Sequence, residues 1–394
     1  MPKLLPGVSN NEAVAQLPPD VLESISQRNP DEDLAGFAGA WSGWGGRGGI
    51  IGLALAVEPD STGAASIVVI RTADSIPPLE HRGSARLVGQ ELIASLPSGT
   101  QMRYRLRNAD TMEFVWRSTN GNWMAGILSR SNERSVMRRM LIPTQLTENS
   151  ARVSLEAVIY QPDGKGPFPT LVFNHGSTGT GSDSSLFSKT WAEPNIARWF
   201  TQRGWMVVFP QRRGRGRSTG LYREGLEEDG SGYSIRPEVS LPGIDRALTD
   251  IDTVVNWATK QAEVNAERML IGGQSRGGLL SVVYAGTRPE KFMGAINFVG
   301  GWMGDRLEAT RAINREAFLR GAGTGTSSLW LYADQDPFYS LEHSRANFAA
   351  YMAAGGKGEF HALAVKPKQN GHQVIADSQL WGARVDAFIK SHAP

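Results

Sequence analysis

The chain has 394 residues, more than one ordinary domain, so its length predicts two domains. A formal net charge of +2 is too small to indicate a nucleic-acid partner, and the lack of cysteine excludes disulfides, thiolate catalysis and cysteine-based zinc sites. The longest uninterrupted apolar run, residues 50–57, is too short to span a membrane. No signal peptide is visible, so the compartment stays open: cytoplasmic, or periplasmic or secreted if a signal was removed. The oligomeric state also stays open.

The first part of the chain predicts an arm followed by a β-rich domain. Residues 1–35 are rich in proline, asparagine and aspartate, which is typical of a lead-in arm. Over 36–135, short apolar runs are separated by turn residues. Met112, Phe114 and Trp116 recur at every second position, the period of a half-buried strand. We expect an antiparallel meander that closes into a small sandwich or barrel-like domain.

Residues 136–394 alternate apolar runs with amphipathic or alanine-rich segments. This rhythm, with nearly continuous apolar strands, favours a mostly parallel sheet with helices on both faces, an α/β domain that carries the catalysis. The strands are expected to begin near Val153, Phe168, Trp205, Arg268, Phe292, Ser328 and Glu359.

Residues 273–277 read Gly-Gln-Ser-Arg-Gly and follow an apolar strand, MLIGG, that leads into a helix-compatible segment, GGLLSVVYAG. A strand that turns sharply into a helix exposes the serine hydroxyl at the carboxyl end of the sheet, beside a helix N-terminus that favours negative charge. We therefore predict that Ser275 is the nucleophile. The alternative is a glycine-rich turn without a catalytic role.

A serine nucleophile needs a base and an acid at the same sheet edge. Of the six histidines, His372 lies in a polar loop between the last strand and the final helix, so it is the predicted base. Asp336 follows the preceding strand and is the predicted acid, with Asp334 as its rival and helix capping as its alternative role. The chain order serine, aspartate, histidine is that of α/β-hydrolases.

The negative oxygen of a tetrahedral intermediate needs two hydrogen-bond donors. The backbone N–H of Arg276 directly follows the nucleophile, and Ser177, or Gly176 beside it, offers the second after the first long strand.

Four further residues are candidates for the substrate pocket. Tyr222 and Tyr233 lie in a long segment, 214–242, that is expected to act as a partial lid. Trp302 follows the strand that ends in NFVG. His175 directly follows the first long strand, where it also suits a structural role in the oxyanion loop. Surface packing alone is the alternative for the two tyrosines and the tryptophan.

Two charged clusters have simple explanations. The arginines at 212, 213, 215 and 217 fit a loop whose arginines pair with backbone or carboxylates, although one of them, or Arg276, could bind an acidic group of the substrate. The acidic run 227–229 has no histidine near it in the sequence, so we expect no metal site there.

Taken together, the motifs FNHGSTG, FPQRRGRGRSTG, GQSRGG, YADQDP and NGHQV resemble the dienelactone-hydrolase-like and prolyl-oligopeptidase-like branch of the α/β-hydrolase superfamily, over residues 145–394. The resemblance implies an eight-stranded core, a Ser-His-Asp triad, acyl transfer and no cofactor. The namesake dienelactone hydrolases use a cysteine nucleophile, which this chain lacks, so their lactone specificity is not carried over. No propeller-sized domain precedes the catalytic part, unlike in the oligopeptidases.

These features predict a serine hydrolase that cleaves carboxylic esters of small molecules through an acyl-enzyme. The first alternative is a hydrolase of small peptides or amides. The second, from another class, is a catalytically inactive hydrolase scaffold that carries a β binding module.

Overall fold

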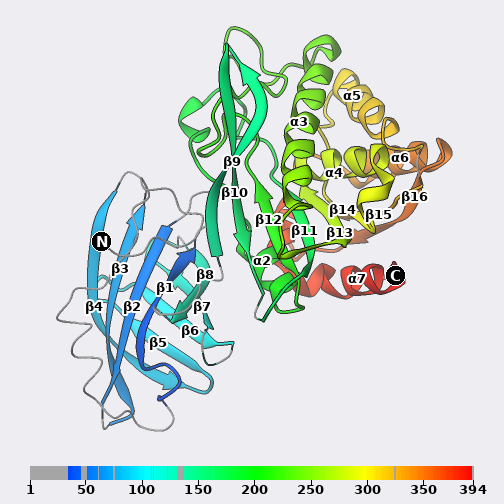
Figure 1. The fold of residues 1–394 in the computed structure, drawn as a ribbon. Coiled ribbons are helices and arrows are strands. Elements are labelled where there is room, and N and C mark those ends of the chain that lie inside the picture. The colour runs from blue at the N-terminus through cyan, green and yellow to red at the C-terminus, as the bar shows by residue number, and fades with distance from the viewer. Residues whose placement is uncertain are drawn as a thin grey trace. The chain divides into compact units, whose positions relative to one another are not determined.

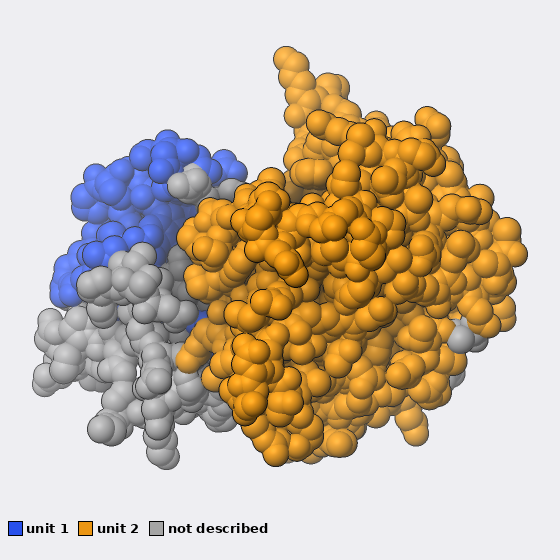
Figure 2. All heavy atoms as spheres, turned by 90° about the horizontal axis from the view of Figure 1, so that it is seen from above, with its two compact units in different colours: residues 1–140 blue, residues 141–394 orange. Residues whose placement is uncertain are grey.

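The structure of the protein is a computed structural model that describes residues 34–45, 51–60, 62–73, 76–107, 109, 111–121, 123–130, 137–162, 164–323 and 325–392. The chain divides into two compact units, Met1–Met140 and Leu141–Pro394, coloured separately in Figure 2. The predicted arm, 1–35, lies outside the described residues except for its last two.

Unit 1 is a closed barrel of eight strands, in which each strand pairs antiparallel with the next and β8 pairs with β1 (Figure 1). The strands are β1 (Gly39–Gly45), β2 (Ile51–Pro59), β3 (Ala64–Ala73), β4 (Ile76–Val88), β5 (Glu91–Ser95), β6 (Gln101–Leu106), β7 (Thr111–Arg117) and β8 (Trp123–Arg130). The predicted antiparallel meander is confirmed, and it closes as a barrel and not as a sandwich.

The barrel is held together by an apolar interior that the period-two pattern supplies. Met112, Phe114 and Trp116 of β7 all lie in one core cluster, and the residues between them face outward or are only partly buried. Burying such a side chain contributes about 1.5–3 kcal/mol relative to leaving it exposed. Alternation along each strand therefore both specifies the register and fills the barrel.

Unit 2 is built on an eight-stranded sheet with the order β16-β15-β14-β13-β11-β12-β10-β9 (Figure 1). The strands from β11 to β16 pair in parallel, and β10 pairs antiparallel with β12. The strands are β9 (Met137–Glu148), β10 (Ala151–Tyr160), β11 (Phe168–Asn174), β12 (Met206–Pro210), β13 (Val264–Gln274), β14 (Gly294–Phe298), β15 (Ser327–Ala333) and β16 (Lys357–Leu363). All residues of β12 and β14 are buried, as expected for a covered parallel sheet.

Helices cover both faces of this sheet. One group is formed by α2 and α7, which contact each other, and the other by α3 to α6, in which α4 and α5 contact their neighbours (Figure 1). The helices are α2 (Pro194–Thr201), α3 (Pro237–Ala258), α4 (Arg276–Thr287), α5 (Glu308–Leu319), α6 (Leu341–Ala353) and α7 (Ser378–Ser391), with short 3₁₀ turns η1 (Ser184–Leu186), η2 (Pro289–Lys291) and η3 (Gly371–Ala376). This is the α/β-hydrolase fold that the sequence predicts.

Helix α3 differs from the sequence expectation at its start. The segment 214–242 was expected to act as a partial lid, but its last residues are helical, because α3 begins at Pro237 and continues through Pro242. Proline suits a first helical position, where the missing N–H has no partner to lose. Among the described residues, no helix combines the length and apolarity that crossing a membrane requires.

Candidate active site

Ser275 lies at the sharp turn between β13 and α4. Its φ of 57° and ψ of −125° are values that residues other than glycine rarely adopt. A Cβ on Gly277 would lie 2.1 Å from the Asn174 carbonyl oxygen, and one on Gly273 would lie 2.4 Å from the Gly277 carbonyl oxygen. Both positions therefore need glycine, because strand and helix approach too closely for any side chain. The predicted strand, turn and helix are present, and they bring the serine to the carboxyl edge of the sheet.

The structure brings His372 and Asp336 together at this same edge. His372 Nδ1 lies 2.9 Å from Asp336 Oδ2, and the two side chains are only 9% and 1% exposed. The other carboxylate oxygen of Asp336 accepts hydrogen bonds from the N–H groups of Phe338 (2.8 Å) and Tyr339 (3.2 Å). The rival Asp334 instead accepts from the Val365 N–H at 2.8 Å and serves its loop. Asp336 thus orients a histidine and accepts hydrogen bonds from a turn, but helix α6 begins at Leu341 with Ser340 as its N-cap, so the helix-capping role considered for Asp336 is not observed.

Tyr339 is a site residue that the sequence analysis missed. It is buried, its ring lies 5.7 Å from that of His372, and its hydroxyl interacts with the side chain of Ser275. Burial raises the pKa of Tyr339, so the phenol is neutral at pH 7. Within the described residues, Ser275 makes no hydrogen bond to His372. Catalytic hydrogen bonds are often incomplete without substrate.

Both segments that carry the predicted oxyanion donors lie beside the serine. Arg276 is the first residue of α4, so its N–H belongs to the positive end of that helix. The segment after β11 runs beside the nucleophile, because a Cβ on Gly176 would lie 3.1 Å from Ser275 Cβ and 3.6 Å from Ser275 Oγ. Ser177, next along that segment, is exposed.

His175 is buried beneath this segment. Its Nδ1 lies 2.8 Å from the Gly176 carbonyl oxygen, and its Nε2 faces the Arg212 N–H at 3.4 Å. Burial, and then the positive charges of Arg212 and Arg215, hold the pKa of His175 well below its ordinary value. A neutral imidazole with both nitrogens engaged supports the loop that carries Gly176, and it leaves no ring nitrogen for substrate.

A buried ion pair also holds the loop that carries His175 and Gly176. Arg212 donates to both carboxylate oxygens of Glu224, and it also donates to the carbonyl oxygens of His175 (3.0 Å) and Gly176 (3.3 Å). Burial would raise the pKa of Glu224, but the charge and hydrogen bonds of Arg212 outweigh it, and the pKa lies below its ordinary value. The pair is charged and satisfied, so its arginine is unavailable to a substrate.

The Arg276 side chain is enclosed in the same way. Its guanidinium carbon lies 3.5 Å from the centre of the Tyr233 ring and 4.0 Å from that of Trp302, between the two. It donates to the carbonyl oxygens of Trp302 (2.9 Å) and Glu224 (2.8 Å), and it is 1% exposed. The hypothesis that this arginine binds an acidic substrate group therefore has no geometric support.

The predicted pocket residues Tyr222 and Tyr233 belong to a chain of hydrogen bonds. Their hydroxyls are 2.8 Å apart, Tyr222 donates to Glu224 at 3.1 Å, and Tyr233 accepts from the Thr178 N–H at 2.8 Å. These hydrogen bonds connect the 214–242 segment to the loop after β11. Tyr222 and Trp302 are buried, with exposed fractions of 6% and 1%, so their side chains pack inside the protein and offer little surface to a substrate.

The arginine cluster after β12 follows the simpler of its two explanations. Arg213 pairs with Asp250, with their nearest nitrogen and oxygen 2.7 Å apart, and Arg215 donates to the Leu186 carbonyl oxygen at 2.6 Å. These side chains organise the loop and are already paired.

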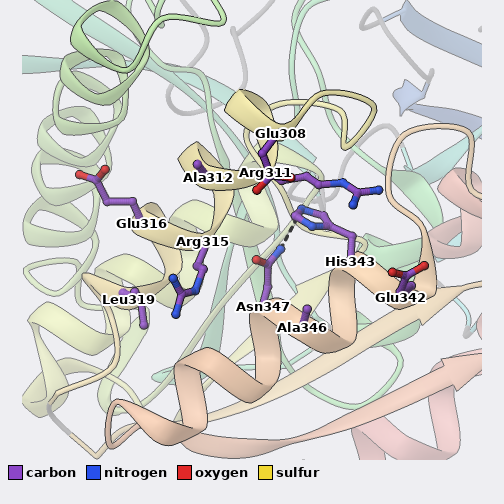
Figure 3. Close-up of a pocket in the computed structure, with 10 residues that line it drawn as sticks. All are labelled: Glu308, Arg311, Ala312, Arg315, Glu316, Leu319, Glu342, His343, Ala346 and Asn347. Carbon is purple, nitrogen blue, oxygen red and sulfur yellow. Dashed lines mark hydrogen bonds between the residues drawn. The ribbon is translucent and has the colours of Figure 1, made fainter.

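A separate cavity of about 560 Å³ lies between α5 and α6 (Figure 3). Its lining includes His343, whose Nε2 is 3.1 Å from the Asn314 amide and 3.0 Å from the Asn347 amide. Burial lowers the pKa of His343. None of Ser275, Asp336 and His372 lines this cavity, so it is not the site described above. Within the described residues, no group of three or more histidine and carboxylate side chains could hold a metal.

Several solved structures resemble the chain at low identity. A protein of Klebsiella pneumoniae assigned as a dienelactone hydrolase is 17% identical, with a TM-score of 0.42, and the match covers 64% of this chain and 98% of that one. An esterase of Pyrococcus furiosus is 14% identical, with a TM-score of 0.45 and coverage of 65% and 90%. A prolyl endopeptidase is 13% identical, with a TM-score of 0.42 and coverage of 87% and 62%. No curated protein matches.

The sequence itself gives the decisive match. Residues 151–354 match the family of X-Pro dipeptidyl-peptidases, known as the S15 family. This stretch exceeds half of the chain and includes Ser275 and Asp336, but it ends before His372. The chain therefore belongs to the S15 family, a family of serine hydrolases within the α/β-hydrolase superfamily.

Proposed function

We propose that the protein is a serine esterase that cleaves carboxylic esters of small molecules through an acyl-enzyme. The observation that carries the proposal is the 2.9 Å contact between Asp336 and His372 at the sheet edge where Ser275 adopts its strained backbone. Structural turns have no need for a buried carboxylate on a histidine beside such a serine.

In the proposed mechanism, Asp336 accepts a hydrogen bond from His372 Nδ1–H, which keeps the proton on Nδ1 and leaves Nε2 free as a base. His372 takes the proton of the Ser275 hydroxyl while the serine oxygen attacks the ester carbonyl. The tetrahedral intermediate collapses, and His372 gives this proton to the leaving alcohol. Water then attacks the acyl-enzyme by the same route and releases the acid.

The negative oxygen of the intermediate would bind the N–H of Arg276 and that of Ser177, with Gly176 as the alternative. We add the Tyr339 hydroxyl as a third group, because it already interacts with the Ser275 side chain. As the serine oxygen forms its new bond, this neutral phenol can donate either to that oxygen or to the oxyanion.

Two features favour esters over X-Pro peptides. An enzyme that removes dipeptides must bind a free ammonium group, which calls for a carboxylate in the pocket. Two carboxylates of the site are already engaged, Asp336 by His372 and Glu224 by Arg212, while Asp305 uses one oxygen to accept from the N–H and hydroxyl of Ser340. The second feature is apolar.

Phe338 is that feature. Its ring lies 4.7 Å from the ring of His372, and the residue is 49% exposed. An exposed aromatic ring beside the base offers an apolar contact to the acyl or alcohol part of an uncharged ester.

The test is the hydrolysis of p-nitrophenyl acetate, butyrate and octanoate by the wild type and by Ser275→Ala. We expect the variant to lose about four to six orders of magnitude in rate, because the nucleophile is removed. A fluorophosphonate probe should label the wild type at Ser275 and leave the variant unlabelled. Equal turnover by the two proteins would contradict the proposal.

Membership of the S15 family favours one further candidate, a hydrolase of small peptides or amides. Comparing kcat/KM for an X-Pro p-nitroanilide with that for p-nitrophenyl butyrate separates the two substrate classes. A value higher for the anilide assigns the peptidase reaction to the same Ser275. If neither substrate reacts and no probe labels Ser275, the remaining alternative, an inactive scaffold with a β binding module, is the better interpretation.

A further inference from the structure

At one end of the barrel, the side chains that point inward change from apolar groups to hydrogen-bond donors. On β3 the inward row runs through Ile67 and Val69 of the core cluster and continues to Arg71. On β4 the position that pairs with Val69 is His81, and on β7 the inward row ends at Trp116. The same alternation that builds the apolar core thus brings these three side chains to one place.

The three side chains contact one another across the barrel. The Arg71 guanidinium carbon lies 4.4 Å from the centre of the Trp116 ring, and the His81 ring meets that ring edge-on at 5.9 Å. Strands β4 and β7 are separated in the sheet by β5 and β6, so the contact crosses the lumen and does not run along the wall.

This cluster contains buried ring nitrogens and a guanidinium for which the described residues supply no acceptor. The Nε1 of Trp116 and the Nε2 of His81 are buried, and among the described residues neither has a hydrogen-bond partner. In the part of the chain that the structure describes, no carboxylate or carbonyl oxygen accepts from Arg71, and burial lowers the pKa of this arginine. Burial, and then the charge of Arg71, also lower the pKa of His81. Buried donors are nearly always paired in folded proteins, so this cluster calls for an acceptor.

The opposite end of the barrel shows what a purely structural pair looks like. Arg130 lies over Trp41, with its guanidinium carbon 4.3 Å from the ring centre. The Trp41 Nε1 donates to the Phe37 carbonyl oxygen at 2.9 Å. The guanidinium donates to the carbonyl oxygens of Gly36 (3.1 Å), Ala38 (2.8 Å) and Ala109 (2.8 Å). The two pairs share their chemistry, and they differ in that only the Arg130 pair is supplied with acceptors.

We propose that Arg71, Trp116 and His81 form a binding site for the carboxylate group of a small organic acid. A carboxylate offers two acceptor oxygens that fit the fork of a guanidinium, and it can also accept from an indole N–H and an imidazole N–H. Val69 and Phe114, the next layer inward, are fully buried in the core cluster, so the acid is short or extends away from the core.

The site is tested by the indole N–H signal of Trp116 in ¹H–¹⁵N spectra of the full chain, assigned with Trp116→Phe. Sodium acetate and sodium butyrate are titrated against sodium chloride at matched ionic strength. We expect a saturable downfield shift of this signal with the carboxylates, because the indole proton gains a charged acceptor. The absence of such a shift, or an equal shift with chloride, overturns the proposal.

Two variants sharpen the test. Arg71→Gln removes the charge and the fork, and it should weaken binding at least about tenfold, the usual scale for a lost charged hydrogen bond. Arg82→Gln is the matched control, because Arg82 lies one residue beyond His81 and its side chain is 58% exposed and paired with Glu80. The control should bind like the wild type. An unchanged affinity in Arg71→Gln, in a protein with a wild-type spectrum elsewhere, contradicts the assigned site.

Discussion

The barrel and the edge of the hydrolase sheet bury very different side chains. The barrel cluster is apolar from Trp41 on β1 to Leu128 on β8, apart from Arg71 and His81, which contact it at one end. The hydrolase edge buries charged residues, among them Arg212, Glu224 and Arg276. Apolar burial stabilises without regard to partners, whereas each buried charge stabilises only while its partner is present. The comparison predicts that single substitutions act differently in the two units.

The largest effect should come from the acid of the proposed triad. Asp336→Asn should lower kcat/KM by about 10⁴, because an amide leaves His372 in the wrong tautomer. Asp334→Asn is the matched control and should stay close to the wild type, since the Asp334 carboxylate accepts from the Val365 N–H and, among the described residues, makes no hydrogen bond to His372. Hydrolysis of p-nitrophenyl butyrate measures both. Equal losses in the two variants would remove Asp336 from its proposed role.

The second effect concerns the buried ion pair. Arg212→Met should destabilise unit 2 by about 3–5 kcal/mol, because Glu224 is left charged and without its partner. Adding Glu224→Gln to this variant should recover part of the loss, since the orphaned charge is removed. Urea unfolding, with unit 2 followed by its activity, measures the difference. A double variant no more stable than Arg212→Met would contradict the explanation.

In the barrel, a core truncation should act on that unit alone. Met112→Ala should lower the stability of the barrel by about 2–5 kcal/mol through lost burial and a residual cavity. Esterase activity per folded molecule should not change, because no residue of the barrel belongs to the proposed triad. Differential scanning calorimetry combined with activity measurements tests this, and a parallel loss of activity would show that the two units depend on each other.

A smaller effect is expected at the site residue that the sequence did not reveal. Tyr339→Phe should lower kcat by about 10- to 100-fold, at or below the usual effect of losing one oxyanion donor. KM should change little if the hydroxyl acts mainly in the transition state. Burst kinetics with p-nitrophenyl acetate separates acylation from deacylation. If Tyr339→Phe keeps the kcat of the wild type, the Tyr339 hydroxyl has no catalytic role and the residue only packs against its neighbours.

The smallest effect is a dependence on pH. The pKa of Glu224 is lower in the folded protein than its ordinary value of 4.5. The stability that this carboxylate contributes is therefore complete above pH 4.5 and is lost as the pH falls toward the folded pKa. Urea midpoints measured at neutral pH and at a series of pH values below 4.5 should show this decrease in the wild type. The decrease should be smaller in Arg212→Met/Glu224→Gln, which lacks the titrating pair.

Much of the fold follows from local patterns in the sequence. Alternation at Met112, Phe114 and Trp116 predicted the barrel strands, and glycines around Ser275 predicted the turn, because both signals act between near neighbours. Whether the meander closed as a barrel or a sandwich depended on the pairing of β8 with β1, across the whole unit, and no local signal carries that information.

The sequence also predicted part of the candidate site, namely the residues whose signals lie in chain order and strand ends. Chain order and strand ends pointed to Asp336 and His372, which the structure brings together. Tyr339 was missed because it reaches Ser275 through tertiary packing, and an aromatic residue three positions after Asp336 has no distinctive spacing. Tyr222 and Tyr233 were expected to line a pocket, yet their hydroxyls bond to each other, a pairing that a single sequence does not show.

The enclosure of Arg276 has a consequence for engineering the substrate range. The backbone N–H of Arg276 is proposed to bind the oxyanion, and the guanidinium of the same residue packs against the rings of Tyr233 and Trp302. Replacing either aromatic residue to change the substrate range would also loosen the start of α4. Variants at Tyr233 or Trp302 should therefore be slow enzymes with a broad substrate range more often than enzymes with a new selectivity. Exposed rings such as Phe338 are the better positions for changing the substrate range.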